Sequence, residues 1–113
     1  MTRLQTVVEL DSFLKRAKAI MSDEERLAII SWLAANPEAG ISLGSGLRKM
    51  RVPRAGGGKS GGYRTIHVFG GIHMPLFLLT VFAKNEKDNL SRGELADLVE
   101  LSKRIIAAYG GIK

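Results

Sequence analysis

The stretch Met74–Ala83, MPLFLLTVFA, decides how the rest of the chain is arranged. It holds no charged residue. Because successive side chains of a strand point to opposite faces, both faces of this strand are apolar. Such a strand suits a central place in a sheet that is covered on each side. The remaining elements must supply that cover.

Two more strands are expected before this stretch. The pair Gly70-Gly71 connects it to a strand over Tyr63–Phe69, and the segment Leu47–Val52 shows a period of two. One face of that segment holds Leu47, Lys49 and Arg51, and the other holds Arg48, Met50 and Val52. We therefore expect a strand with a charged face.

Two capping-box signatures predict where helices begin. Ser22 with Glu25, and Ser91 with Glu94, place a hydroxyl and a carboxylate three residues apart, where they satisfy the amide groups of a first helical turn. The helices that follow carry apolar stripes at Leu27, Ile30, Leu33 and Ala34 and at Leu95, Leu98, Val99, Ile105, Ile106 and Tyr109. Gly110 ends the last helix.

The N-terminal part is expected to add a strand and a helix. Residues 6–10 suit a short strand, after which apolar residues recur at helical spacing, at Phe13, Leu14, Ala17, Ile20 and Met21. Pro37 ends the second helix because the residue before a proline disfavours helical backbone. The glycines at positions 40, 44 and 46 then predict a loop.

The expected fold is α+β, with order β-α-α-β-β-β-α and an antiparallel sheet packed against helices. At 113 residues, 45% apolar and 25% charged, the chain suits a single domain over residues 1–113. The absence of cysteine excludes disulfides and thiolate metal sites, and we expect no metal and no cofactor. The longest apolar run is half a membrane span, so we expect a cytoplasmic protein with no membrane partner.

Charge is strongly segregated along the chain. Residues 39–85 contain seven Lys or Arg and no Asp or Glu, which leaves ten Lys or Arg beside all eleven acids elsewhere. The seven are Arg48, Lys49, Arg51, Arg54, Lys59, Arg64 and Lys84. Solubility alone is normally served by interleaved charges. The segregation therefore favours a polyanionic partner, most simply a nucleic acid.

The glycine-rich segment imitates two nucleotide-binding motifs. Residues 56–61 fit the pattern G-x-G-x-x-G, but that motif needs a following helix, and here a strand is expected. Residues 58–60 resemble the end of a phosphate-binding P-loop, but Pro53 stands where its first glycine belongs. A hairpin loop is the favoured interpretation, and a basic loop that folds onto phosphates is the alternative.

Lys49 and Arg51 are the leading site candidates. On one strand face they lie about 6.6 Å apart at a rise of about 3.3 Å per residue, and Arg64 on the neighbouring strand can join them. His67 lies within an expected strand, which is typical of a packed or hydrogen-bonded residue. His73 lies in the hairpin connection, where a general acid would be accessible.

Three segments together resemble the RelE/ParE superfamily of bacterial toxins, most closely its HigB-like members. They are residues 46–51 (GLRKMR), 62–66 (GYRTI) and 82–90 (FAKNEKDNL). The likeness in element order spans roughly residues 22–109. In that family a small toxin cuts messenger RNA in the ribosomal decoding site, and an antitoxin neutralises it. The ParE branch acts on DNA gyrase instead.

The resemblance implies which residues form the site. It places Lys49 and Arg51 on the family's basic strand and Arg64 in its Tyr-Arg pair, and we expect these three to be catalytic. Binding of RNA or phosphate is expected of Arg48, Arg54, Lys59, Lys84 and Asn85. Asn85 stands where RelE has a second arginine, and Ser91 lies near the place of a RelE tyrosine. These departures leave the general acid open.

The expected activity is a metal-independent endoribonuclease. Crowding among cations disfavours the charged form of an amine, so Lys49 is the candidate base, and the two arginines would clamp the phosphate. The expected partners are messenger RNA on the ribosome and an antitoxin that is acidic or carries a helix-turn-helix. Operator DNA would be bound only through the antitoxin complex. A ParE-like gyrase inhibitor and a non-toxic nucleic-acid-binding accessory protein remain open alternatives.

Overall fold

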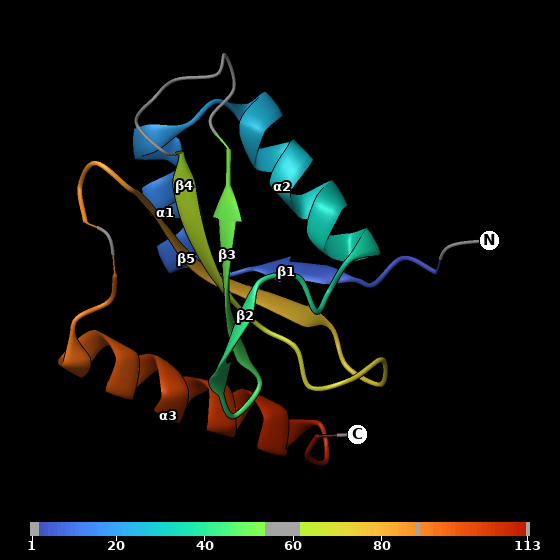
Figure 1. The fold of residues 1–113 in the computed structure, drawn as a ribbon. Coiled ribbons are helices and arrows are strands. Elements are labelled where there is room, and N and C mark those ends of the chain that lie inside the picture. The colour runs from blue at the N-terminus through green and yellow to red at the C-terminus, as the bar shows by residue number, and fades with distance from the viewer. Residues whose placement is uncertain (1–2, 54–61, 88, 113) are drawn as a thin grey trace.

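The computed structural model describes residues 3–53, 62–87 and 89–112 (Figure 1). Its elements are β1 (Val7–Glu9), α1 (Asp11–Ile20), α2 (Asp23–Ala35), β2 (Ile41–Gly44), β3 (Leu47–Val52), β4 (Tyr63–Val68), β5 (Leu76–Ala83) and α3 (Arg92–Ala108). This α+β arrangement confirms the expected fold class and contains the expected order of elements, with one strand more.

The additional strand is β2, which lies in the segment that we expected to be a loop. It pairs antiparallel with β3, from Ile41 opposite Lys49 to Gly44 opposite Leu47, and the register shifts between Ser42 and Gly44. Because this segment is short and contains glycine, its sequence does not show the period of two that predicts a strand. Its hydrogen bonds to β3 decide its conformation instead.

The strands form one sheet of order β1-β5-β4-β3-β2. Three neighbouring pairs are antiparallel, but β1 runs parallel to β5, with Val7 opposite Leu76. The expectation of an antiparallel sheet was therefore wrong for this edge. The direction of β1 depends on a partner about 70 positions away, and a long crossover of this kind permits parallel pairing.

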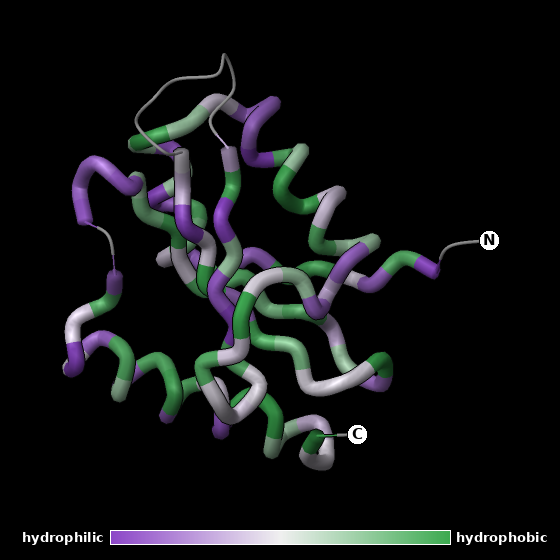
Figure 2. The backbone as a smooth tube through the Cα atoms, in the orientation of Figure 1, coloured by the Kyte–Doolittle hydropathy of each residue, from purple (hydrophilic) through white to green (hydrophobic). Residues whose placement is uncertain are grey.

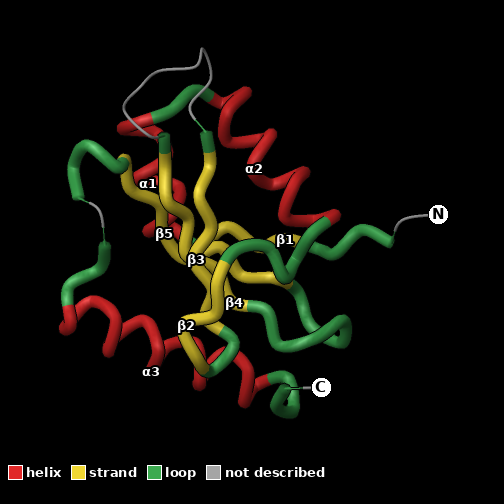
Figure 3. The backbone as a smooth tube through the Cα atoms, viewed as in Figure 1, coloured by secondary structure: helices red, strands yellow, loops and turns green. Residues whose placement is uncertain are grey.

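Helices cover both faces of the sheet, as Figures 1 and 3 show. On one face α1 and α2 bury Phe13, Ala17, Ile29 and Leu33 against Leu78 and Val81. On the other face α3 buries Ile106 and packs Leu95, Leu98 and Val99 against Leu79 and Phe82. Hydrophilic and hydrophobic residues alternate along α3 in Figure 2, as expected for a helix with one face on a sheet.

Strand β5 has the expected two apolar faces because it contributes to both cores. A register shift opposite Ile66 and His67 leaves Leu79 as an extra residue in β5. Leu79 and Phe82 consequently face α3, whereas Leu78 and Val81 face α1 and α2. Such a bulge bends a strand. In β5 the bulge also lets the apolar residues before and after it pack into one of the two cores.

Both capping boxes form as predicted. Ser22 and Glu25 exchange hydrogen bonds at the start of α2, and Ser91 and Glu94 do so at the start of α3. The predicted inward face of α2 was partly wrong, because Leu27 is 54% exposed while Ile29 is buried. Helix α2 has apolar residues on more than one of its faces, so their spacing in the sequence did not show which face is buried.

Gly40 allows the chain to approach β3 closely, and its replacement tests that contact. Its φ is +86°, and a Cβ there would lie 2.1 Å from the backbone oxygen of Lys49. Gly44 has a similar φ of +95° but open space around it. We expect Gly44→Ala to lower the free energy of unfolding by about 1–2 kcal/mol through backbone strain. Gly40→Ala should cost about 1–3 kcal/mol more through the clash, measured by urea unfolding. Equal losses would show that the close approach adds nothing.

Candidate functional site

The pairing of β3 with β4 brings the three leading candidates onto one face of the sheet. Arg51 lies directly opposite Arg64, and Lys49 lies two positions before Arg51. Directly opposite residues have Cβ atoms about 5 Å apart, and diagonal neighbours are about 7–8 Å apart. Lys49, Arg51 and Arg64 therefore form one cluster, which we call the three-cation cluster. It lies on the face that α3 covers, because Leu47 and Ile66 on that face belong to the core beneath α3.

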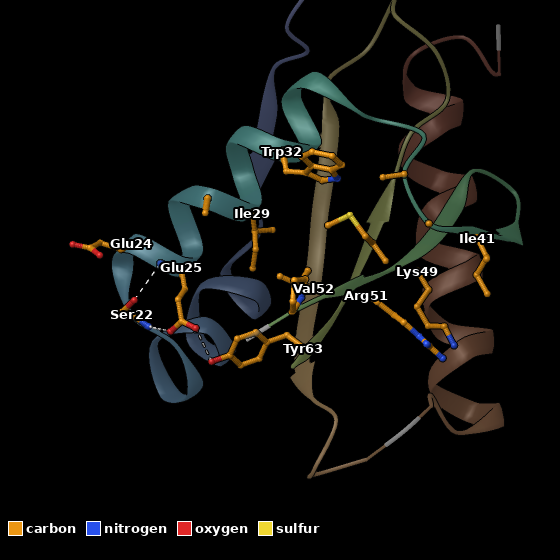
Figure 4. Close-up of a pocket in the computed structure, with 15 residues that line it drawn as sticks. Ser22, Glu24, Glu25, Ile29, Trp32, Ile41, Lys49, Arg51, Val52 and Tyr63 are labelled. Carbon is orange, nitrogen blue, oxygen red and sulfur yellow. Dashed lines mark hydrogen bonds between the residues drawn. The ribbon is translucent and has the colours of Figure 1, made fainter. Parts of the chain in front are cut away.

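The members of the three-cation cluster differ in exposure. Arg64 is only 4% exposed, and one of its terminal nitrogens donates to the Tyr63 carbonyl at 3.3 Å. Arg51 is exposed, and Lys49 is half-buried. Figure 4 shows the Lys49 and Arg51 side chains extending in the same direction, away from α2. An anion could thus reach Arg51 and Lys49 from solvent while Arg64 stays fixed beneath.

The segment before α3 closes one side of the cluster. Lys49 Nζ donates to Asn89 Oδ1 at 2.6 Å. Phe82 lies opposite Arg64 on β5, and Lys87 Nζ lies 5.1 Å from the centroid of the Phe82 ring. Lys87 also pairs with Glu94 at 2.5 Å, and this hydrogen bond is the main cause that lowers the pKa of Glu94 to about 2. Glu94 is thereby already engaged by a cation.

Of the other predicted RNA-binding residues, the structure describes Arg48, Lys84 and Asn85. Arg48 lies on the opposite sheet face, and its guanidinium donates to the carbonyls of Ala39 and Gly40 at 3.3 and 3.0 Å. This gives Arg48 a structural task, which is to hold the chain that leads into β2. Lys84 and Asn85 are exposed just after β5. Arg54 and Lys59 lie outside the described residues.

The histidines and Tyr63 lie away from the cluster. His67 is fully buried, as expected for a packed strand residue, and its Nε2 lies 2.9 Å from the Pro37 carbonyl. Burial is the main cause that lowers the pKa of His67 to about 4. His73 is exposed in a turn. The Tyr63 hydroxyl donates toward the Ile20 carbonyl and lies 3.2 Å from Glu25 Oε2, beneath α2.

Two further searches bear on the kind of site. Within residues 3–53, 62–87 and 89–112, no three His, Asp or Glu side chains gather where they could hold a metal ion. No helix in the same residues is long and apolar enough to cross a bilayer. The three-cation cluster itself presents one amine and two guanidinium groups.

A comparison with known protein families gives a match over most of the chain. The family model described as the RelE toxin of the RelE/RelB toxin-antitoxin system matches residues 7–110. The chain belongs to the RelE toxin family. This RelE-family protein is accordingly a toxin of a toxin-antitoxin system, and an antitoxin is its partner. The closer likeness to HigB stays a prediction.

Two features of this RelE-family toxin were missed by sequence reasoning. One is Asn89, which holds Lys49 across 40 positions of the chain. The other is an open groove between α2 and β3, lined by Trp32 and Ile41. Exposed apolar residues at helical spacing look like core residues in a sequence. Only the position of α2 on the sheet distinguishes the two.

The buried His67 makes a pH prediction. Its pKa is about 4 in the folded toxin and about 6.5 when unfolded. The unfolded chain thus binds more protons below pH 6.5, so the stability from neutral His67 is complete above that pH and is lost as pH falls toward 4. We expect the free energy of unfolding to drop by about 2 kcal/mol between pH 7 and pH 5. Urea unfolding of wild-type and His67→Gln proteins should show this drop only in the wild type. A variant with the same pH dependence would contradict the assignment.

Proposed function

We propose that this toxin is an endoribonuclease that cuts messenger RNA on the ribosome, with the three-cation cluster as its catalytic site. The observation that carries the proposal is the register of β3 and β4, which places Arg51 opposite Arg64 on the face that also holds Lys49. Like charges directly opposite each other destabilise a sheet. A phosphate between them would turn that repulsion into attraction.

Cutting RNA without a metal makes three demands. A base must take the proton of the 2′-hydroxyl, charge on the phosphoryl oxygens must be stabilised, and the departing 5′ oxygen must receive a proton. We assign the first demand to Lys49, because an amine can exchange its proton whereas a guanidinium holds it firmly. The second falls to Arg51 and Arg64, whose planar donors suit a phosphate.

The contacts of each residue fit these roles. Arg64 is buried and already held by the Tyr63 carbonyl, so it offers donors in a fixed place. Preorganised donors stabilise a transition state without rearrangement. Lys49 is held by Asn89, which keeps its amine on the face of Arg51. The attacking 2′ oxygen would form the new bond to phosphorus as the bond to the 5′ oxygen breaks. The products are a 2′,3′-cyclic phosphate and a 5′ hydroxyl, whose proton would come from water.

The ribosome supplies what the small toxin lacks. Positioning of the message in the decoding site would align the 2′ oxygen, phosphorus and 5′ oxygen before the toxin acts. The exposed cations Lys84 and Arg51 are available for phosphates on either side of the cut. The antitoxin then has a clear target, because covering one cluster would stop the reaction.

Replacing Lys49 tests the proposed chemistry. We expect Lys49→Ala to lower the rate of message cutting about 100-fold or more, since general bases typically contribute that much. The measurement is mapping of RNA ends after the toxin is mixed with translating ribosomes. Lys103→Ala, an exposed lysine on α3, serves as the matched control and should cut at the wild-type rate. Urea unfolding of each variant separates lost chemistry from lost folding.

Two outcomes would contradict the proposal. Full activity of a folded Lys49→Ala protein would remove Lys49 from the mechanism. Intact translated messages combined with DNA damage after expression of the wild-type toxin would favour a ParE-like gyrase inhibitor instead.

A further inference from the structure

Glu94 on α3 anchors the chain on both sides of Asn89. One of its carboxylate oxygens pairs with Lys87, two positions before Asn89, and the other accepts from the backbone amide of Ser91, two positions after it. The hydrogen bond with Lys87 is the main cause that lowers the pKa of Glu94 to about 2, so this carboxylate keeps its charge at neutral pH. Asn89 therefore lies between two anchored residues, and from there its Oδ1 accepts from Lys49 Nζ at 2.6 Å.

The described side chains beside Lys49 on the sheet are cationic or apolar. They are Arg51 on β3, Arg64 and Ile66 on β4 and Ile41 on β2. Helix α3 faces the sheet with apolar residues, and at its start Glu94 is paired with Lys87. The acceptor that Lys49 does reach, the amide oxygen of Asn89, carries no charge.

The kind of acceptor matters for a lysine that acts as a base. Only the neutral amine can take a proton, and it has two N–H groups and one lone pair. Because Lys49 donates to Asn89, this contact uses an N–H group and not the lone pair. A carboxylate in the place of the amide would hold the nitrogen more strongly, but it would favour the ammonium form, which has no lone pair. An amide oxygen orients the nitrogen without adding that negative charge.

We propose that Asn89 is the positioning residue of the general base, and that its neutral amide oxygen orients the Lys49 amine toward the 2′-hydroxyl of the RNA. The proton of that hydroxyl passes to the lone pair, and the amine becomes an ammonium group. The inference rests on the proposed function, since the orientation of Lys49 matters only if Lys49 takes this proton. A role in folding alone explains the contact less well. Asn89 is exposed, and ordering a long lysine side chain costs conformational entropy, so their hydrogen bond adds little to stability.

Two replacements of Asn89 separate orientation from charge. Asn89→Leu removes the acceptor without adding charge, and we expect it to lower the rate of message cutting about tenfold or more at every pH. Asn89→Asp keeps an acceptor of the same size but adds a negative charge. Its rate should reach half of its maximum at a pH at least about one unit above that of the wild type, and should approach the wild-type rate at the highest pH. The measurement is the first-order rate of cutting on isolated ribosome–message complexes with excess toxin, from about pH 6 to about pH 9.

The control places the same charge elsewhere on the chain. Ile72 is 64% exposed in the turn that follows β4, whereas Arg64 lies near the beginning of that strand. Ile72→Asp changes the net charge by as much as Asn89→Asp does, and it should keep the wild-type rate and pH profile. Urea unfolding checks that each variant is folded.

A labelling experiment measures the effect of charge without RNA. Acetic anhydride reacts with neutral amines, so we expect the Lys49 amine of Asn89→Asp to be acetylated about tenfold more slowly than that of the wild type at the same pH. Lys103, which is exposed on α3, should react alike in both proteins.

The inference is wrong if folded Asn89→Leu cuts at the wild-type rate, or if Asn89→Asp keeps the wild-type pH profile or the wild-type rate of Lys49 acetylation. An equal loss of cutting at every pH in both Asn89 variants, with lower free energies of unfolding, would make the contact purely structural. Full cutting by Lys49→Ala would instead refute the proposed function, whatever the labelling shows.

Discussion

The interaction on which the proposed site depends is the antiparallel pairing of β3 with β4, which sets Arg51 against Arg64. Arg64 is almost entirely removed from water. The two guanidinium groups on opposite residues repel each other, which disfavours this pairing. The apolar residues of the same strands, Leu47 and Ile66, anchor the register against this cost by their burial beneath α3. A one-residue slip would turn those residues outward and move the cations to the other face.

The second organising feature is that the two faces of the sheet carry different groups of residues. The face beneath α3 carries the three-cation cluster at its edge, where the segment before α3 contributes Asn89. The face beneath α1 and α2 carries the buried His67 and the apolar groove. Neighbouring residues of β3 serve both sides, since Met50 packs in one core while Lys49 and Arg51 point away from it. A six-residue strand thus carries the proposed catalytic cations on one face and lines the apolar groove with the other.

Local signals in the sequence predicted local structure well. The bounds of β3, the alternation of its faces, both capping boxes and the apolar character of β5 needed only neighbours within a few residues. What failed depends on distant partners. Strand β2 is defined by its pairing with β3, and the parallel direction of β1 is defined by β5. The exposed side of α2 depends on how the helix rests on the sheet, which is why Leu27 was misplaced.

The same distinction applies to the candidate site. A strand period placed Lys49 and Arg51 together, but the position of Arg64 directly opposite Arg51 required the register of two strands joined by a glycine-rich connection. The role of Arg48 in holding the Ala39 and Gly40 carbonyls could not be seen from a charge count. The contact between Lys49 and Asn89 likewise joins residues that no local pattern relates.

The parallel pairing of β1 with β5 delays folding while the chain is being synthesised. The first strand to leave a ribosome has no partner until the fifth has followed it. The cover that α3 gives to the cationic face comes later still. Contacts between distant parts of a chain close slowly, so a half-made polypeptide cannot hold its arginines in the finished geometry. The face that holds the arginines is therefore completed only after α3, the last helix of the chain, has packed on the sheet.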